Sequence, residues 1–376
     1  MGRPIVFCIV GTRPEAVKMA PVVLELRKRQ EVETILVSTG QHREILLSAL
    51  GTFGLSPDRD LAIMQHGQTL EQITSRALEG LSHLTEELRP SMIVAQGDTT
   101  TTFVASLLAF YRRIPFAHVE AGLRTDTIDD PFPEEFNRRA TGLVASLHFP
   151  PTEWARDNLL REGKDPGRIF VTGNTGIDAV LKAGAEIQEE WYPEHRGRVV
   201  TMTTHRRENW GDPQRRIAKA ARTIVEWFED VLLVVALHPN PSVRETIAPI
   251  LQGHERVRLI EPPEYGRFVK LMQRSSLMLS DSGGVQEEAP AFGVPVLVMR
   301  ETTERPEGVT AGTARLVGSN EKEIVDQATE LLSDSSAYAR MANAVSPYGD
   351  GKAAERIRYV ILRELGIPGP EVPMWT

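Results

Sequence analysis

The sequence predicts an α/β protein that contains two doubly wound parallel sheets. The chain has 376 residues, which exceeds the usual size of one hydrophobic core and favours two domains. Short runs of β-branched residues alternate with longer amphipathic stretches along the whole chain, as in successive βαβ units. Hydrophobic residues make up 41% and charged residues 25%, which is typical of a soluble globular protein.

The first half of the chain begins with an apolar run followed by a helix that starts at Pro14. A second apolar run precedes another helix, which begins after Gln41. The same alternation continues without a break, so these runs are expected to be neighbouring strands of one parallel sheet. The expected strands are IVFCIV (5–10), ETILVS (33–38), SMIVAQ (91–96), FAHVEA (116–121), SLHFP (146–150) and IFVTG (169–173).

The second half restarts the pattern after the polar stretch QEEWYPEHRGR (188–198), and we expect the domain junction in or just before it. Residues 353–365 look helical and could pack back on either domain. Ligands of doubly wound sheets bind at the carboxyl ends of the strands, so the residues after each strand are the candidates for chemistry. The strands expected in this half are VVTMTT (199–204), VLLVVALH (231–238), VRLIEP (257–262), LMLSD (277–281) and PVLVMR (295–300).

Composition argues against several classes of protein. The net charge of −8 disfavours a general nucleic-acid binder, because such binding depends on clustered lysines and arginines. No uninterrupted apolar stretch has the length of a membrane span, so no membrane partner and a cytoplasmic location are expected. The single cysteine, Cys8, cannot form an internal disulfide, and the histidines lack metal-ligand spacing. We expect no metal held by the protein.

The stretch SDSGGVQEEAP (280–290) is a candidate anion site. Ser282, Gly283 and Gly284 follow a strand and open a helix, where glycines allow close approach and free N–H groups favour a phosphate. Glu288, about one turn inside, could accept both hydroxyls of a ribose, which indicates a nucleotide. The alternative is an ordinary capped helix whose early acids complement its dipole.

A second candidate is GTRPEAVKMAP (11–21), after the first strand. Arg13 and Lys18 bring two positive charges to the carboxyl edge of the sheet, which suits a diphosphate, although Lys18 alone could be a surface lysine. In THRRENWG (204–211), His205 follows a strand and could donate to a phosphate or move a proton.

Acids also follow the strands of the first half. Asp98 lies in AQGDTTTT, Glu120 in AHVEAGLRT, and Glu134 with Arg138 in PFPEEFNRR. Asp98 could simply cap a helix, whereas Glu120 follows a buried strand, where a carboxylate costs free energy unless it has a use. Grouped carboxylates suit general acid and base catalysis.

Taken together, GTRPEAVKMAP, GQHRE, GDTTTT, HVEAGLRT, FPEEFNRR, THRRENWG, DSGGVQEEAPAFGVPVLVMR, TTERPEGVTAGT and SPYGDG closely resemble the non-hydrolysing UDP-N-acetylglucosamine 2-epimerases. The resemblance covers Gly11 to about Gly351. It implies two Rossmann-like domains in the GT-B arrangement, with the active site in an interdomain cleft. The implied boundaries are 1–172 with 359–376, which supplies a crossover helix, and 173–358, which binds UDP.

The resemblance implies interconversion of UDP-N-acetylglucosamine (UDP-GlcNAc) and UDP-N-acetylmannosamine (UDP-ManNAc) without a redox cofactor. A C2 proton is removed while UDP leaves C1, and UDP then adds back to 2-acetamidoglucal. By carry-over, Ser282, Gly283 and Gly284 would bind the diphosphate, Glu288 the ribose and Phe268 the uracil, with Arg13 and His205 on phosphate or sugar. Catalytic acids would be Asp98, Glu120 and Glu134, supported by Lys18, Arg138 and His205.

One departure is the loop GLRTDTIDDPFPEE, in which Asp126, Asp129 and Asp130 replace the family's usual glycine and tyrosine-serine. This loop bears on substrate choice and on activation by a second UDP-GlcNAc, for which Gln41, Gln68 and His238 resemble the relevant residues. The resemblance also implies a homodimer and a role in cell-surface polysaccharide biosynthesis. Three alternatives stay open: a hydrolysing epimerase that releases ManNAc and UDP, a GT-B glycosyltransferase, and a non-catalytic UDP-sugar sensor.

Overall fold

The structure is a computed structural model that describes residues 2–40, 43–65 and 67–375. Contacts divide the chain into two compact units, Met1–Ala179 with Tyr348–Thr376 (unit 1) and Val180–Pro347 (unit 2). Each unit contains one six-stranded sheet in which every strand pair is parallel, which confirms the predicted α/β class. The domain boundaries implied by the resemblance remain a prediction.

The sheet of unit 1 has the strand order β3-β2-β1-β4-β5-β6. Its strands are β1 (Ile5–Val10), β2 (Glu33–Ser38), β3 (Arg59–Asp60), β4 (Met92–Gln96), β5 (Phe116–Val119) and β6 (Leu147–Phe149). The order reverses between β1 and β4, which is the place where doubly wound sheets bind their ligands.

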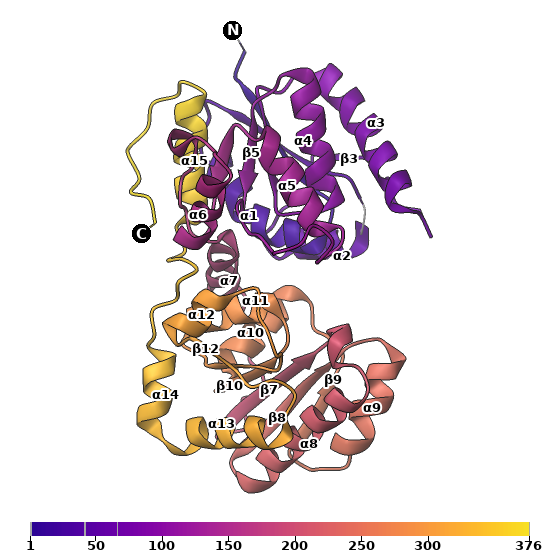
Figure 1. The fold of residues 1–376 in the computed structure, drawn as a ribbon, viewed down its shortest axis with the longest axis vertical. Helices are drawn as coiled ribbons and strands as arrows, with labels where there is room; N and C mark the ends of the chain where they lie inside the picture. Colours follow the sequence, from indigo (N-terminus) through magenta and orange to yellow (C-terminus); the bar gives the residue numbers. More distant parts are fainter. Residues whose placement is uncertain (1, 41–42, 66, 376) are drawn as a thin grey trace. The chain divides into compact units, whose positions relative to one another are not determined.

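Helices bury both faces of this sheet. Phe7 and Ile9 of β1 pack with the apolar sides of α3 (Leu70–Leu88) and α4 (Thr100–Arg112) in one core. The helix α1 (Arg13–Arg27) packs on β1, β2 and β4, and α15 (Ala353–Glu364), yellow in Figure 1, runs beside it. The remaining helices are α2 (Arg43–Gly51), α5 (Glu134–Val144), α6 (Glu153–Arg161), the 3-10 turn η1 (Pro166–Arg168) and α7 (Thr175–Glu186), which continues into unit 2.

The sheet of unit 2 has the order β12-β11-β10-β7-β8-β9. Its strands are β7 (Arg198–Thr204), β8 (Val231–Leu237), β9 (Val257–Ile260), β10 (Leu277–Ser280), β11 (Val296–Val298) and β12 (Ala314–Leu316). When its strands are counted from β7, this is the same order as in unit 1, with the reversal between β7 and β10.

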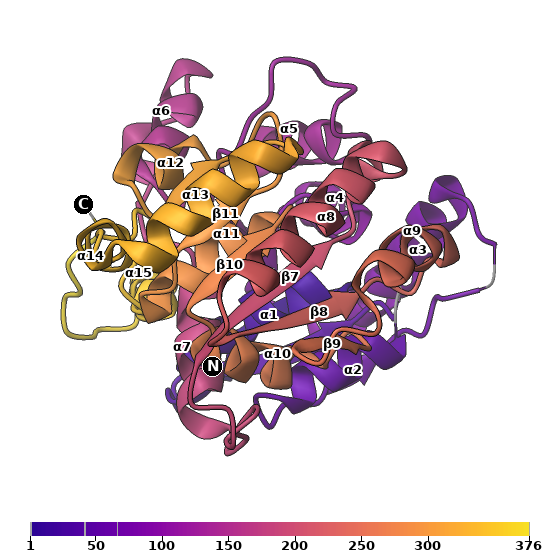
Figure 2. The ribbon, with the colours of Figure 1, turned by 90° about the horizontal axis from the view of Figure 1, so that it is seen from below.

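One face of this sheet is covered by α8 (Asp212–Trp227), α9 (Pro241–Leu251) and α13 (Glu321–Ser333), as Figure 2 shows. Leu271 of α10 (Tyr265–Arg274) packs on the opposite face. The other elements are η2 (Arg207–Asn209), α11 (Gly283–Glu288), η3 (Ala289–Phe292), α12 (Pro306–Ala311) and α14 (Ser335–Ala342). None of the helices in the described residues is both long and apolar enough to cross a bilayer.

One strand prediction was wrong, and two short strands were not predicted. The stretch 169–173 is not a strand, because it makes only an isolated bridge from Ile169 to His148 of β6. The short edge strands β3 and β12 were not predicted, since two or three residues carry no readable alternation. Both errors lie at sheet edges, where pairing depends on tertiary contacts more than on local pattern.

Candidate active site

The carboxyl ends of β1, β4 and β5 bring several predicted residues of unit 1 together. Arg13 begins α1 and is exposed, whereas Lys18 lies one turn further along the same helix and is mostly buried. Asp98 and Glu120 follow β4 and β5, which are neighbours in the sheet. A Cβ atom added to Gly97 would lie 3.7 Å from Glu120 Oε2, so the Glu120 carboxylate lies over the residue that precedes Asp98.

Three side chains donate to the Glu120 carboxylate. Lys18 Nζ contacts Oε1 and Gln96 Nε2 contacts Oε2, while Asn174 Nδ2 lies 3.4 Å from Oε1. The Glu120 side chain is 7% exposed, and its backbone is in the left-handed region with φ 60°. A non-glycine residue in this region costs free energy and is uncommon. Glu120 is therefore a buried carboxylate that the surrounding structure holds in one orientation.

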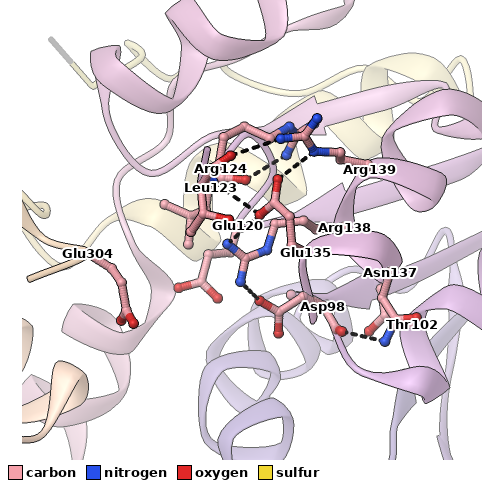
Figure 3. A network of polar contacts seen from close by, with 12 residues as sticks. Asp98, Thr102, Glu120, Leu123, Arg124, Glu135, Asn137, Arg138, Arg139 and Glu304 are labelled. Atoms are coloured by element: carbon pink, nitrogen blue, oxygen red, sulfur yellow. Dashed lines mark hydrogen bonds and ion pairs between the residues drawn. The ribbon is translucent and has the colours of Figure 1, made fainter. Parts of the chain in front are cut away.

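Asp98 is not the cap of the following helix, because Thr99 Oγ1 takes that role by accepting from Thr102 N. The Asp98 carboxylate instead pairs with the Arg138 guanidinium, as Figure 3 shows. Asn137 Nδ2 donates to the Asp98 carbonyl oxygen at 2.9 Å. The Asp98 carboxylate therefore pairs with a cation and can also contact a ligand at the end of the strand.

His118 supports the turn that carries Asp98. Its Nε2 lies 2.7 Å from the carbonyl oxygen of Gly97, and the side chain is buried. Burial lowers the pKa of His118 to about 3, so the ring is neutral at physiological pH and Nε2 can donate to the carbonyl. This supporting histidine was not singled out from the sequence, because a histidine inside a strand gives no local signal of its partner.

Glu134 and Glu135 begin α5 but differ in environment. Glu134 is half-buried, and among the described residues no side chain forms a hydrogen bond or ion pair with its carboxylate. Glu135 is fully buried and pairs with Arg138 Nη1 at 3.3 Å and Arg139 Nε at 2.6 Å, and its Oε2 accepts from Thr125 N at 3.2 Å. Figure 3 shows Glu135 beside Arg138 and Arg139. Glu135 therefore positions Arg138, and Glu134 as a catalytic acid stays a prediction.

A further acid, Glu15, was missed by the sequence analysis. Its carboxylate is 1% exposed and accepts from Gly11 N at 3.0 Å and Thr12 N at 2.7 Å, both in the turn after β1. It also accepts from Thr99 Oγ1 at 2.7 Å and Thr102 Oγ1 at 3.2 Å, which follow β4. Burial raises the pKa of Glu15 above its ordinary value. Glu15 thus fixes the loop that precedes Lys18 to the loop that carries Asp98.

In unit 2, the buried acid Asp281 directly follows β10. Its carboxylate accepts from Thr204 Oγ1 at 2.8 Å, Arg206 N at 3.1 Å and Asn209 Nδ2 at 3.0 Å. His205 contributes both its backbone N–H and Nδ1 at 3.1 Å. Although burial by itself raises the pKa of Asp281, these donors, His205 first, hold it at about 2.

The predicted nucleotide residues lie beside Asp281. Ser282 is the N-cap of α11, whose helix includes Gly283 and Gly284, and the first N–H groups of a helix have no acceptor within it. Glu288 ends this helix next to the hydroxyl of Tyr265; burial and then the Glu288 charge raise the pKa of Tyr265 well above its ordinary value. Phe268 is half-buried on α10 and packs against the apolar residues of β7 and β8.

The residues implicated in activation are distributed over both units. Gln68 Oε1 accepts from Arg76 Nη1 at 3.0 Å in unit 1, and Gln41 lies outside the described residues. The His238 ring stacks on that of His205 in unit 2 with centroids 6.3 Å apart. Burial, then the nearby His205, lowers the pKa of His238. The acids of the departing loop, Asp126, Asp129 and Asp130, are all exposed.

No group of three or more His, Cys, Asp or Glu side chains in the described residues could hold a metal ion. The chemistry that these residues can perform is proton transfer by Asp98 and Glu120, with Lys18 and Arg138 as cations beside them. In unit 2, backbone N–H groups and the half-exposed His205 can bind an anion. Unit 1 thus offers groups for acid and base catalysis, and unit 2 offers groups for anion binding.

Comparisons with known proteins identify the family of the chain. The model of the family "UDP-N-acetylglucosamine 2-epimerase" matches residues 24–362. A curated protein of that name from Bacillus subtilis (strain 168) is 49% identical over 363 residues, with 96% of both chains covered. The solved UDP-GlcNAc 2-epimerase of Neisseria meningitidis, bound to UDP-GlcNAc, is 43% identical with a TM-score of 0.88, covering 96% of this chain and 100% of that one.

A more distant solved relative is the UDP-GlcNAc 2-epimerase of Methanocaldococcus jannaschii in complex with UDP-GlcNAc and UDP. It is 33% identical, with a TM-score of 0.79 over 96% of this chain and 99% of that one. The similarity therefore extends over both units and is not confined to a single motif.

Proposed function

The chain belongs to the UDP-N-acetylglucosamine 2-epimerase family, and from this premise we propose that it interconverts UDP-GlcNAc and UDP-ManNAc without net hydrolysis. The names of its relatives support activity as a UDP-GlcNAc 2-epimerase. The observation that carries the non-hydrolysing mechanism is the pair of carboxylates after β4 and β5, each held by a cation. Such an arrangement suits removal and return of a proton at one carbon.

The proposed reaction proceeds by elimination and addition. A carboxylate takes the proton from C2, the electrons of the C–H bond form a C1=C2 double bond, and the C1–O bond breaks so that UDP leaves with its electron pair. The products are 2-acetamidoglucal and UDP. In the return step a proton adds to the other face of C2 and a UDP oxygen adds to C1. Atoms and electrons balance, and no redox cofactor is needed.

Asp98 and Glu120 are proposed as the proton-transferring groups, and Glu134 as a further acid. The contacts of Lys18 and Arg138 support a role in keeping Glu120 and Asp98 oriented, and both cations can also stabilise negative charge that develops during elimination. Transfer by a positioned carboxylate contributes about 10²- to 10⁴-fold to a rate.

Unit 2 is proposed to bind the UDP part of the substrate. Ser282, Gly283 and Gly284 would take the diphosphate, with Glu288 on the ribose and Phe268 near the uracil. Arg13 and His205 would contact phosphate or sugar. The uncapped N–H groups of α11 and the half-exposed ring of His205 support this assignment.

The first test is an NMR time course of the purified protein with UDP-GlcNAc in D₂O, without added metal or NAD. The proposal expects UDP-ManNAc with deuterium at C2. Free ManNAc with UDP would indicate the hydrolysing reaction instead. If UDP binds but no exchange occurs with this or other acetamido sugar nucleotides, a glycosyltransferase or a UDP-sugar sensor would replace the proposal.

The acids are tested by Asp98→Asn and Glu120→Gln. Each should reduce C2 exchange by about 10²- to 10⁴-fold, because the amide cannot accept the proton, while the affinity for UDP stays close to that of the unmodified protein. Glu364→Gln is a matched control, since Glu364 makes an ion pair with Arg168 on the surface of unit 1. Full activity in either acid variant would remove that acid from the mechanism.

The same proposal includes a homodimer, which exposed apolar side chains on α4 and α5 support. Phe110 is 62% and Leu143 77% exposed, and Phe136 makes an edge contact with Phe103 at 5.5 Å. Exposed apolar groups on neighbouring helices favour association with another surface. Light scattering of the unmodified protein and of Phe110→Glu measures the mass of each protein in solution. A mass near that of the monomer for the unmodified protein would reject the dimer.

Activation by a second UDP-GlcNAc through Gln41, Gln68 and His238 is also proposed, as are a cytoplasmic location and a role in cell-surface polysaccharide biosynthesis. These points rest on the resemblance. Saturation curves for UDP-GlcNAc should be sigmoidal if activation is retained despite the acidic loop.

A further inference from the structure

Three arginines of unit 2 share one carboxylate, although Arg300 Nε also pairs with Glu208 at 2.7 Å and Arg305 Nε with Glu287 at 2.8 Å. Glu304, in the loop between β11 and α12, lies 2.9 Å from Arg305 Nη1, 3.6 Å from Arg300 Nη2 and 3.8 Å from Arg206 Nη2. The arginines come from different segments, since Arg206 follows β7, Arg300 follows β11 and Arg305 precedes α12. Burial alone would raise the pKa of Glu304, but these cations, with Arg305 first, lower it.

The arginines flank the glycine turn at the end of β10. In the sheet, β10 lies between β11 and β7, the two strands that Arg300 and Arg206 follow. A Cβ atom added to Gly283 would lie 3.1 Å from Arg305 Cζ, so that guanidinium packs directly on the turn. The three cations are therefore next to the backbone proposed to take a diphosphate.

The arginines also have donors that Glu304 does not satisfy. Arg300 is 6% exposed, and its Nη1 is buried without an acceptor among the described residues. Arg206 Nε is also buried, and no described residue accepts a hydrogen bond from it. A buried charged donor that lacks an acceptor costs free energy. An anion with more oxygens than one carboxylate would satisfy these donors better.

The Glu304 side chain can rotate away from the arginines without movement of the loop backbone. Its side chain is 35% exposed, whereas the loop backbone is fixed by Thr303 Oγ1, which donates to Gln286 Oε1 at 2.7 Å and accepts from Arg305 N at 3.1 Å. Glu287, the other carboxylate on Arg305, is 5% exposed and has no such freedom. The exchange therefore needs rotation of one side chain only.

We propose that Arg206, Arg300 and Arg305 bind the diphosphate of the nucleotide and that Glu304 is the resident anion which the diphosphate displaces. This inference rests on the proposed binding of UDP by unit 2. With the diphosphate bound, Glu304 lies next to it as a like charge. That repulsion weakens binding and favours release of the nucleotide, while in the absence of nucleotide Glu304 keeps the arginines neutralised and in place.

The test is calorimetric titration of the full chain and of Glu304→Gln with UDP and with inorganic pyrophosphate, at low and high NaCl. Removal of the competing charge should tighten both ligands by about three- to tenfold at low salt, in the range expected for partly exposed ion pairs. The gain should shrink at high salt, because salt screens partly exposed charges. Glu304→Ala should behave in the same way.

Glu301→Gln is the matched control. Glu301 lies in the same loop but accepts from Ser319 N at 3.3 Å and contacts none of the three arginines, so affinity should not change. Unchanged or weaker binding by both Glu304 variants, with the melting temperature preserved, would overturn the inference while the proposed function stands. Failure of the unmodified protein to bind UDP would overturn both.

Discussion

The two units share one strand order, and in both a buried acid connects the same two loops. The acid comes from the first of these loops in unit 1 and from the second in unit 2. In each sheet a fully buried carboxylate ties the loop after the first strand to the loop after the fourth. In unit 1 the acid is Glu15, which follows the first strand and accepts from Thr99 and Thr102 after the fourth. In unit 2 it is Asp281, at the end of the fourth strand, and it accepts from residues that follow the first.

The pKa values of the two acids shift in opposite directions. Burial dominates at Glu15, whose donors are hydroxyl groups and backbone amides, and it raises the pKa. At Asp281 the hydrogen bond and charge of His205, together with Asn209, outweigh burial and lower the pKa to about 2. The comparison shows that the number of donors does not decide the direction in which the pKa of a buried carboxylate shifts. An adjacent group that can carry positive charge decides it.

The largest expected difference between the acids is in stability. Asp281→Asn should lower the free energy of unfolding by about 3–5 kcal/mol, because it removes the charge on which the His205, Arg206 and Asn209 contacts depend. Glu15→Gln should cost less, about 1–3 kcal/mol, because the donors to Glu15 named above are neutral backbone amides and hydroxyl groups. Denaturant unfolding at neutral pH measures both, and an equal or larger loss for Glu15→Gln would contradict the comparison.

The next largest effect is on the pH dependence of stability. Because the folded pKa of Asp281 is about 2 and its ordinary value is 3.8, its contribution is complete above the ordinary value and is lost as pH falls towards 2. The shift corresponds to about 2 kcal/mol. Glu15 has the opposite sign: its contribution is complete below 4.5 and is lost as pH rises through the raised pKa.

Unfolding free energies measured across this pH range for the unmodified protein and both variants separate the two acids. Asp281→Asn should flatten the acid side of the stability profile, and Glu15→Gln should flatten the decline on the alkaline side. Identical profiles for all three proteins would show that neither acid titrates differently on folding.

The smallest expected loss of stability follows removal of a single hydroxyl donor to either acid. Thr99→Val and Thr204→Val each remove one hydroxyl, from Glu15 and Asp281 respectively, and each should cost about 1 kcal/mol. The larger loss is expected in unit 2, where the pKa of the acceptor is lowered and not raised. Thr246→Val is the control, since its hydroxyl donates to Ser242 O on an exposed helix. A loss in the control as large as in the other two would remove the special role of the buried acids.

The sequence predicted those parts of the site that follow directly from position along a strand. Lys18, Asp98 and Glu120 of unit 1 and His205 of unit 2 were singled out because polar residues after buried strands lie at the carboxyl edge of their own parallel sheet. Most strands were predicted because their apolar runs are long enough to show a clear pattern. Where alternation was short or at an edge, as at 169–173, the prediction was wrong.

The supporting residues could not be predicted, because their partners are distant in sequence. Glu15 and Thr99 are separated by 84 positions, and Gln96 and Glu120 by 24. Locally, Glu15 is only an acid in a first helical turn, which is its commonest structural place. Glu135 was likewise hidden beside Glu134, since only the burial of one of the two distinguishes adjacent acids.

Unit 2 is one continuous segment, whereas unit 1 is completed by the last residues of the chain. The helix α15 packs on α1, its Ala353 and Ala354 N–H groups donate to Asp178, and its Arg358 contacts Glu25. During synthesis on a ribosome, all of unit 2 is therefore available before unit 1 has its final helix. The half of the protein that is made first therefore cannot be completed until residues 348–376 have also been made.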